Sequence, residues 1–245
     1  KLIEFMRKET KLIKSLRRSI TKLEKLTAQN PADKLHDIKR ELAKVEKLQS
    51  KVPHGAFKEA LDEYIQLIRS KIPRWEKQAR EWFYAKLEEL LKEHKLELRG
   101  YHPNVQTLFY TISVDFEKEA AVIWYGPQQE RLAKCKLSPE LIVSKLVSVH
   151  QSITGRKFDR RQFAKNLHEA YKVAAFREGI KLGENVPIVK VLLEYAIMVQ
   201  DKRFKADPVK RNYRDYGRVY FSYDLYRLGA RRVDGIEIEL TIATR

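Results

Sequence analysis

The 245-residue sequence contains one cysteine, Cys135, and six histidines, none of which lies three or four residues from another. A single cysteine excludes an internal disulfide bond and a cysteine-rich metal site, and it is typical of proteins kept in a reducing compartment. The histidine spacing gives no helix two ligands for one metal ion. We therefore expect no metal and no cofactor, and a cytoplasmic, nucleoid or nuclear location.

The sequence also lacks the short motifs that cradle nucleotide phosphates, G-x-x-x-x-G-K-[ST] and G-x-G-x-x-G, and the G-x-S-x-G turn that exposes a serine nucleophile. Its apolar runs, such as AAVIWY, are far shorter than the roughly 20 residues that a membrane-spanning helix needs. These absences argue against nucleotide hydrolysis and serine-dependent hydrolysis, and they predict no contact with a membrane.

Positive charge, in contrast, is abundant. Lysine and arginine total 50 against 33 aspartates and glutamates, which gives a net charge of +17. The excess lies toward the two ends: residues 1–99 carry 25 basic and 16 acidic side chains, and residues 201–245 carry 11 and 7. A positive field of this size concentrates polyanions around a protein, so the composition predicts nucleic acid as a partner. A basic surface that only keeps the protein in solution is the alternative.

Heptad spacing dominates the first 50 residues. Apolar residues at alternating steps of three and four predict a helix over residues 1–27 and, after the break TAQNPAD, a second helix that Pro31 opens. The two apolar seams consist of Ile13, Leu16, Ile20 and Leu23, and of Leu35, Ile38, Leu42, Val45 and Leu48. We expect an antiparallel coiled-coil hairpin whose seams pair with each other or with a partner chain. A third helix should run from about Ala56 to Lys95, with Pro73 either kinking it or starting a new helix.

The spacing of apolar residues changes after residue 99. Alternating, β-branched and aromatic residues between Val105 and Ser138, with EKEA and GPQQ as turns, predict a three-stranded meander. Ser138 followed by Pro139 predicts a helix that ends near Ser152.

Two helices and a hairpin are predicted beyond residue 158. Asp159, with Gln162 three residues later, is a capping-box pattern for a helix through about Glu178. The stretch VPIVKVLLEYAIMVQ, residues 186–200, is apolar on nearly every side and predicts a helix buried all round. An antiparallel hairpin of Arg218–Leu228 with Ile236–Thr244 should follow, because IEIELTIAT alternates strictly.

These patterns predict an α+β protein of three parts: a helical coiled-coil arm over residues 1–99, a β-meander with a helix over 100–158, and a helical module with a C-terminal β-hairpin over 159–245. Two helices, a loop and a hairpin follow the order of a winged-helix module, in which a helix enters the major groove and the hairpin touches the backbone. The helix at residues 186–200 would take the recognition position. Lys190 is its single cation, so we expect no base reading by that helix.

Aromatic and basic residues are most densely mixed in Val209–Arg232, which holds five tyrosines and six arginines. The tyrosines fit helical steps, whereas Val219, Phe221 and Tyr223 fit one face of a strand, and the strand is favoured because of the hairpin. Arginine binds phosphate oxygens bidentately, and an aromatic face stacks on an unpaired base. The candidate nucleic-acid-binding residues are Lys202, Arg203, Lys205, Lys210, Arg211, Arg214, Arg218, Tyr220, Tyr226, Arg227, Arg231 and Arg232.

We expect a non-catalytic nucleic-acid-binding protein, with DNA favoured over RNA, that acts within a larger assembly and grips phosphates through these basic residues. One alternative is a protein–protein adaptor, such as a subunit of an ATP-driven complex, that meets its partner or a second copy through the basic surface or the N-terminal helices. Another alternative is a metal-dependent nuclease in which Asp115 and Glu117 hold a divalent cation.

Overall fold

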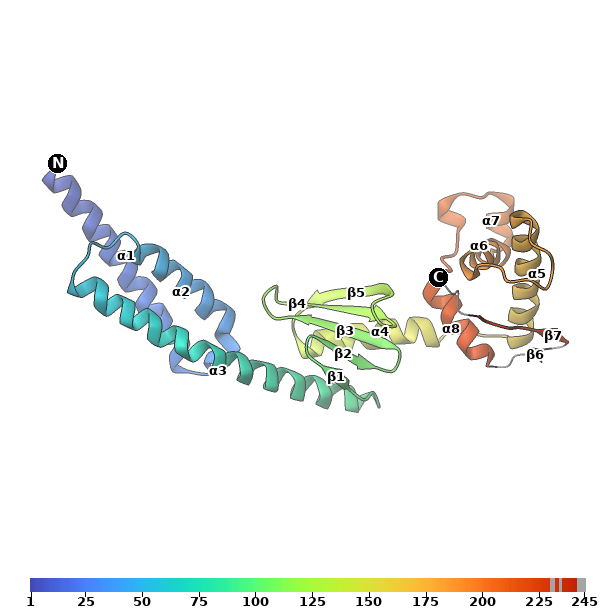
Figure 1. Ribbon diagram of the computed structural model, residues 1–245, viewed down its shortest axis with the longest axis horizontal. Helices are drawn as coiled ribbons and strands as arrows, with labels where there is room; N and C mark the ends of the chain where they lie inside the picture. The colour runs from blue at the N-terminus through green and yellow to red at the C-terminus, as the bar shows by residue number, and fades with distance from the viewer. Residues whose placement is uncertain (230–231, 234, 242–245) are drawn as a thin grey trace. The chain divides into compact units, whose positions relative to one another are not determined.

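The computed structural model describes residues 1–229, 232–233 and 235–241. These residues form eight α-helices, a five-stranded sheet and a two-stranded hairpin near the C-terminus (Figure 1), which confirms the predicted α+β class. The chain divides into two compact units. The first consists of Lys1–Arg99, Val114–Ala121 and Lys136–Val143, and the second of Gly100–Ser113, Val122–Cys135 and Ser144–Arg245. No helix among the described residues is both long enough and apolar enough to cross a membrane.

Three helices make up most of the first unit: α1 (Leu2–Ala28), α2 (Leu35–Gln49) and α3 (Ala56–Glu93). A short 3₁₀ helix, η1 (Pro31–Lys34), joins the first two. In Figure 1, α1, α2 and the first half of α3 lie side by side, and they share one core. That core includes Leu16, Leu23, Ile38, Leu42, Val45, Leu61, Ile65, Ile68 and Trp75. Most of the predicted seam residues thus meet inside the chain, although Ile13 is 52% exposed. The expected two-helix hairpin was incomplete, because α3 is a third member of the cluster.

A buried carboxylate ties α1 to α2. The Glu41 side chain is 5% exposed, and its Oε2 lies 3.2 Å from Lys22 Nζ and 3.0 Å from Lys44 Nζ. Burial raises the pKa of this carboxyl, but hydrogen bonds from Lys44, Ser19 and Lys22 outweigh burial and leave the pKa below its usual value. The ion pair with Lys22 therefore contributes to helix packing in its charged form.

The third helix, α3, continues through Pro73 for 38 residues, so no new helix starts at the proline. Trp75, two residues later, is buried in the three-helix core. The second half of α3 buries Phe83, Leu87 and Leu91. The Phe83 ring lies 5.2 Å from the ring of Phe116, centroid to centroid.

The sheet contains five strands that pair in chain order. They are β1 (Arg99–Tyr101), β2 (Asn104–Thr107), β3 (Tyr110–Asp115), β4 (Ala120–Tyr125) and β5 (Glu130–Lys136). The predicted meander of three strands missed β1, because RGY is too short and too polar to give a strand signal. It also merged β2 with β3, because it began at Val105 and placed no turn between them. The turns predicted at EKEA and GPQQ are confirmed, since they separate β3 from β4 and β4 from β5.

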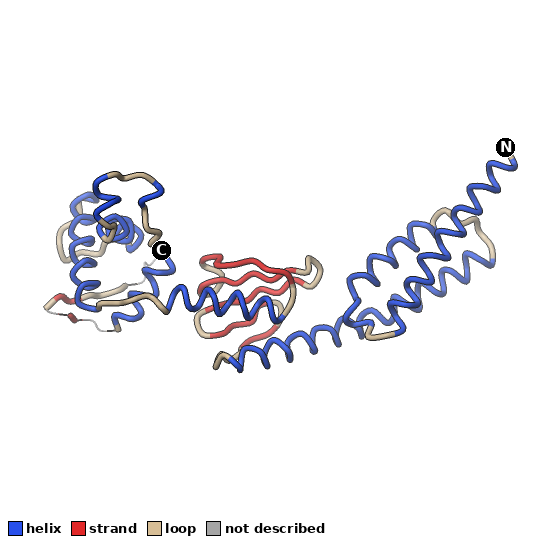
Figure 2. Tube along the Cα trace, turned by 180° about the vertical axis from the view of Figure 1, so that it is seen from behind, coloured by secondary structure: helices blue, strands red, loops and turns tan. Residues whose placement is uncertain are grey.

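One face of the sheet is covered by α4 (Pro139–Thr154), as Figure 2 shows. The helix begins at Pro139 as predicted, and the Ser138 hydroxyl accepts a hydrogen bond from the backbone N–H of Leu141 at 3.4 Å. Tyr110 of β3 contacts α4 through its hydroxyl, which lies 3.1 Å from His150 Nδ1.

The C-terminal part of the second unit is helical and ends in a short hairpin. Its elements are α5 (Arg160–Glu178), α6 (Ile188–Met198), α7 (Lys202–Ala206), the 3₁₀ helix η2 (Lys210–Asn212), α8 (Arg218–Leu228), β6 (Arg232–Val233) and β7 (Ile236–Glu237). The Asp159 half of the predicted capping box is confirmed, because the Asp159 side chain accepts a hydrogen bond from Gln162 N at 3.0 Å, whereas the Gln162 side chain donates to Asn166. Phe163, Val191, Tyr195 and Phe221 belong to one core that α5, α6 and α8 share.

The segment Arg218–Leu228 is the helix α8, and the strand predicted there was wrong. Phe221, Asp224 and Leu228, at steps of three and four, are its buried residues. The hairpin near the C-terminus is instead β6 paired with β7, with Val233 opposite Ile236. Of the strand predicted over Ile236–Thr244, residues 238–241 have no regular structure, and residues 242–244 lie outside the described part of the chain.

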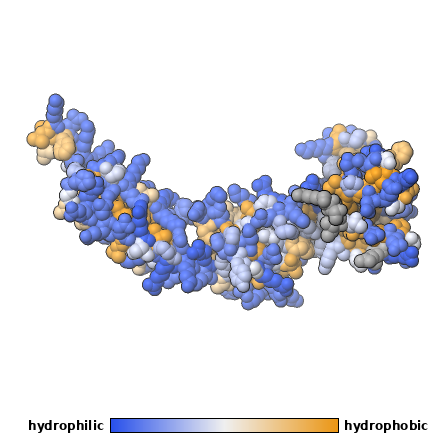
Figure 3. All heavy atoms as spheres, in the orientation of Figure 1, coloured by the Kyte–Doolittle hydropathy of each residue, from blue (hydrophilic) through white to orange (hydrophobic). Residues whose placement is uncertain are grey.

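The helix α6 is not buried all round, contrary to the prediction. Val191 and Tyr195 are buried in the core shared with α5, but Val189, Leu193 and Ile197 are 52%, 53% and 46% exposed. We call these three residues, spaced four apart, the α6 apolar stripe. The space-filling view in Figure 3 shows apolar side chains gathered on the surface of this part of the second unit.

Candidate nucleic-acid interface

Half of the candidate residues lie on the segment that connects α6 to α8. We define the basic loop as residues 201–214, which include α7 and η2. The loop carries Lys202, Arg203, Lys205, Lys210, Arg211 and Arg214, all of them exposed. Its two acids are Asp201 and Asp207. Six cations against two carboxylates in 14 residues make this loop strongly basic.

A single buried side chain closes the base of the basic loop. Gln200 is 3% exposed, and its amide holds the backbone of Arg214 from both sides. Gln200 Nε2 donates to the Arg214 carbonyl at 3.0 Å, and the Arg214 N–H donates to Gln200 Oε1 at 2.8 Å. The same Nε2 also donates to the Ala196 carbonyl of α6 at 2.6 Å. We call these three bonds the Gln200 clamp, and it fixes the end of the loop to α6.

Inside the basic loop, both carboxylates serve the loop's own structure. Asp201 caps α7 by accepting hydrogen bonds from the backbone N–H groups of Arg203 and Phe204 at 3.0 and 3.1 Å. Asp207 accepts one from Asn212 Nδ2 at 3.2 Å and lies 3.4 Å from Arg211. Among the described residues, no carboxylate pairs with the remaining cations of the loop, which are Lys202, Arg203, Lys205, Lys210 and Arg214.

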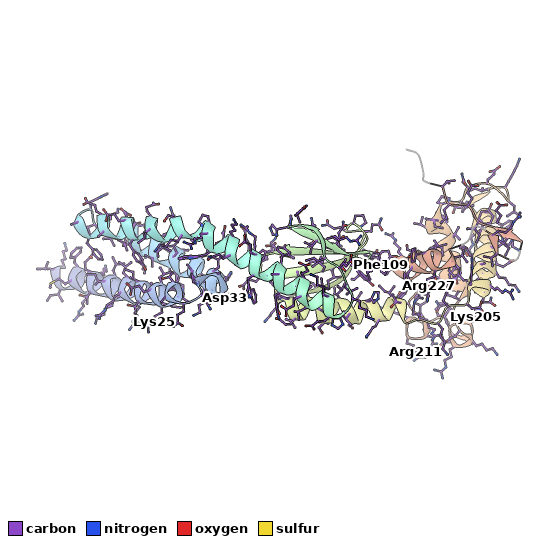
Figure 4. All side chains as sticks on the ribbon, turned by 90° about the horizontal axis from the view of Figure 1, so that it is seen from below. Lys25, Asp33, Phe109, Lys205, Arg211 and Arg227 are labelled. Atoms are coloured by element: carbon purple, nitrogen blue, oxygen red, sulfur yellow. The ribbon has the colours of Figure 1, made fainter. Side chains whose placement is uncertain are left out.

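Two aromatic rings stiffen the loop from within. The rings of Phe204 and Tyr213 meet edge to face, with their centroids 5.5 Å apart, so α7 packs against the returning chain. Lys205 and Arg211 are labelled in Figure 4, where Arg211 projects from the edge of the unit. The cations therefore project from an ordered loop. They remain exposed to solvent, where an external anion can reach them.

Some candidate residues on α8 are exposed and others are packed around a buried carboxylate at the centre of that helix. Asp224 is 4% exposed. Its Oδ1 lies 2.6 Å from an Arg156 nitrogen and also accepts a hydrogen bond from Arg227, and its Oδ2 accepts one from the Tyr216 hydroxyl at 2.7 Å. Burial, followed by the bond to Asp224, raises the pKa of Tyr216 well above its usual range. Asp224 is therefore the polar centre of the buried face of α8.

Two candidate residues, Arg227 and Tyr220, pack against Arg156 in the cluster around Asp224. The Arg227 side chain is 17% exposed, and its guanidinium lies 4.3 Å from the Phe158 ring centroid and donates to the Arg156 carbonyl at 2.9 Å. Tyr220 is half-buried, and the Arg156 guanidinium covers its ring at 4.3 Å from the centroid. Both residues hold α8 to the chain before α5, so we leave them out of the interface.

The remaining candidates are exposed or lie outside the described residues. Arg218 and Tyr226 are exposed on α8, and Tyr226 is 76% exposed. Arg232 of β6 is exposed and lies 3.5 Å from Glu237 across the hairpin. Arg231 lies outside the described part of the chain. The structure thus brings six candidates together on the basic loop and places Arg218, Tyr226 and Arg232 on other elements.

Other residues weighed from the sequence form no reactive site in the structure. Asp115 accepts hydrogen bonds from the backbone N–H groups of Glu117 and Lys118 at 3.1 and 2.9 Å, in the turn that follows β3. In the described ranges, no three histidine, cysteine or acidic side chains are grouped as metal ligands. Cys135 is half-buried in β5, and burial raises the pKa of its thiol. Lys190 of α6 pairs with Glu178 at 2.9 Å.

Sequence reasoning missed two residues that order this part of the chain, Arg156 beside α8 and Gln200 at the base of the basic loop. Arg156 stands in a loop, 68 positions before its partner Asp224, and no local pattern connects them. Gln200 ends an apolar run directly before the cap residue Asp201. A polar residue at that place, where a helix ends and a loop begins, is the only sequence signal for the clamp.

Comparison with protein-family models, with curated proteins and with solved structures finds no match to this chain. The functional proposal therefore depends on the side chains described above.

Proposed function

We propose that the chain is a non-catalytic nucleic-acid-binding protein, with DNA favoured over RNA, which acts within a larger assembly and holds phosphates through the basic loop. The observation that supports this most directly is the set of cations on that loop, Lys202, Arg203, Lys205, Lys210 and Arg214, for which the described residues supply no carboxylate. Phosphate contacts carry no base information, so binding through the loop is independent of sequence.

In a winged-helix-like arrangement, the recognition position would now belong to α8 and not to the helix at residues 186–200. Three helices, α5, α6 and α8, precede the hairpin β6–β7, and the helix directly before the hairpin is α8. Its outward face carries Arg218, Ser222 and Tyr226. One cation and two hydroxyls are a sparse set for reading base edges, which needs bidentate donors or acceptors. This supports binding that does not distinguish sequences.

Binding to labelled duplex and single-stranded oligonucleotides, with and without Mg²⁺, separates the proposal from its alternatives. We expect binding without cleavage in both conditions. Cleavage with Mg²⁺ would establish the nuclease, and no binding at low salt would leave the adaptor.

The basic loop is tested by the salt dependence of the affinity. Lys202→Glu combined with Lys205→Glu removes two phosphate contacts, so the slope of log affinity against log salt should become shallower by about 1.8 on duplex DNA. The control is Lys134→Glu combined with Lys181→Glu, which makes the same charge change at exposed lysines away from the loop. Equal effects of the two double variants would show that only net charge matters, and the loop would lose its role.

The adaptor alternative is favoured by one observation, the α6 apolar stripe. Apolar side chains in a contiguous exposed row are typical of protein–protein contacts. We propose that this stripe is where the larger assembly meets the chain, in addition to the basic loop, so that the two surfaces serve different partners.

A further inference from the structure

The outward face of α8 carries a second feature that the basic loop does not explain. Arg218, Ser222 and Tyr226 are spaced four apart and are all exposed. At 1.5 Å per residue, Arg218 and Tyr226 lie about 12 Å apart along the helix. Tyr226 is 76% exposed, although α8 packs its other side into the core shared with α5 and α6.

The ring of Tyr226 is the outermost member of an aromatic stack. It stacks on Tyr223 with a centroid distance of 6.1 Å and an interplanar angle of 29°. Tyr223 in turn lies 5.4 Å from Phe109, in the turn between β2 and β3. The guanidinium of Arg227 lies 5.0 Å from the Tyr223 centroid, and Figure 4 shows Phe109 next to Arg227. Tyr226 therefore stands on a supported platform and offers aromatic surface to solvent.

We infer that Tyr226 stacks on an unpaired base and that Arg218 holds a phosphate of the same strand. The ligand of this face is then single-stranded nucleic acid. Bases in a duplex have both faces covered by their neighbours, whereas an unpaired base has a free π-face for an aromatic side chain. This inference rests on the proposed function and narrows its ligand.

Charge and length support the same occupant. No carboxylate among the described residues pairs with Arg218, so its guanidinium is available to a phosphate. The roughly 12 Å between Arg218 and Tyr226 corresponds to about three or four nucleotides at the ~3.4 Å spacing of a stacked strand. A protein helix laid on this face would instead need several apolar contacts, and Tyr226 is the single exposed aromatic residue of α8.

The test measures the affinity of the full chain for a fluorescent thymidine 20-mer and for a 20-base-pair duplex by anisotropy at one salt concentration. Tyr226→Ala should weaken single-strand binding about tenfold, within the range of roughly five- to a hundredfold found for one stacked base, and should change duplex binding less than about twofold. Tyr226→Trp should bind single strands at least as well as the wild type. Tyr101→Ala is the matched control, because Tyr101 is 90% exposed on β1.

Arg218→Gln gives a second measurement that does not involve the ring. Arg218→Gln should make the slope of log affinity against log salt shallower by about 0.7 on single strands. In the Arg218→Gln background, Tyr226→Ala should weaken single-strand binding by the same factor as in the wild type. Suppose that the wild type binds. If Tyr226→Ala then weakens duplex and single-strand binding by the same factor, or changes neither affinity, the stacking inference is overturned and the phosphate-binding proposal stands. If the wild type binds neither ligand at low salt, the proposed function itself fails.

Discussion

The Gln200 clamp makes a prediction about stability and binding together. Gln200→Leu removes three hydrogen bonds, two to the Arg214 backbone and one to the Ala196 carbonyl. Each is worth about 1 kcal/mol net, and the two bonds to Arg214 are only partly buried, so the variant should destabilise the closed loop by about 2 kcal/mol. Because each 1.4 kcal/mol changes an equilibrium constant tenfold, the population of the open form of the loop should rise about 30-fold.

Limited digestion with trypsin measures this opening directly, because the basic loop holds six lysines and arginines. Cleavage within residues 202–214, located by mass spectrometry, should become about 30-fold faster, since proteolysis follows the population of the open form. Affinity for nucleic acid should fall, because the strand must then order the loop. The salt slope should stay the same, because no phosphate contact is removed.

Gln200→Glu separates hydrogen bonding from packing. The carboxylate has nearly the shape of the amide, but it cannot donate and it faces the carbonyls of Ala196 and Arg214. We therefore expect Gln200→Glu to open the loop at least as much as Gln200→Leu. Gln151→Leu, at an exposed position of α4, is the control and should be silent. If Gln200→Glu is cut at the wild-type rate, side-chain volume and not the clamp holds the loop, and the reasoning is refuted.

Three further perturbations test other parts of the molecule. Asp224→Ala leaves Arg156 and Arg227 without their buried carboxylate and should lower the free energy of unfolding by about 3–5 kcal/mol in a urea melt, with Asp224→Asn less harmful because its amide oxygen still accepts from Tyr216. Glu41 has a lowered pKa, so its contribution to stability is present above its usual pKa of 4.5 and is lost as pH falls through the folded value. The stability gap between wild type and Glu41→Gln, about 2 kcal/mol at pH 7, should therefore narrow progressively in melts below pH 4.5. Leu193→Asp should change the unfolding free energy by under about 0.5 kcal/mol and abolish co-purification with any partner that covers the α6 apolar stripe, whereas unchanged co-purification would remove the stripe from that contact.

Local signals in the sequence were sufficient where one residue type decides the outcome. Asp159 starts α5 because its carboxylate satisfies a free backbone N–H, and that need exists in any context. The same holds for Pro139 at the start of α4. The α+β class and the cluster of cations on residues 202–214 follow from such local evidence.

The helix α8 was mistaken for a strand because it was paired with the alternating stretch that follows it, and its own helical pattern was weakened by Asp224 on the buried face. A carboxylate is expected at the surface unless it is paired, so the steps Phe221, Asp224 and Leu228 did not look apolar. Arg156, 68 residues away, makes this burial possible, and the distance in sequence hides the pair. The error on α6 has the opposite origin, since an apolar helix indicates burial but does not say that α5 covers only one side of it.

The proline inside α3 has a mechanical consequence. A helix resists bending through its ladder of backbone hydrogen bonds, and at Pro73 one of these bonds is absent because proline has no N–H. Trp75 anchors the helix in the three-helix core beside that turn, and Phe83 anchors the far half against Phe116. A bending force on α3 would therefore be taken up mainly at this turn, and the amide protons next to Pro73 should exchange faster than those elsewhere in the interior of the helix.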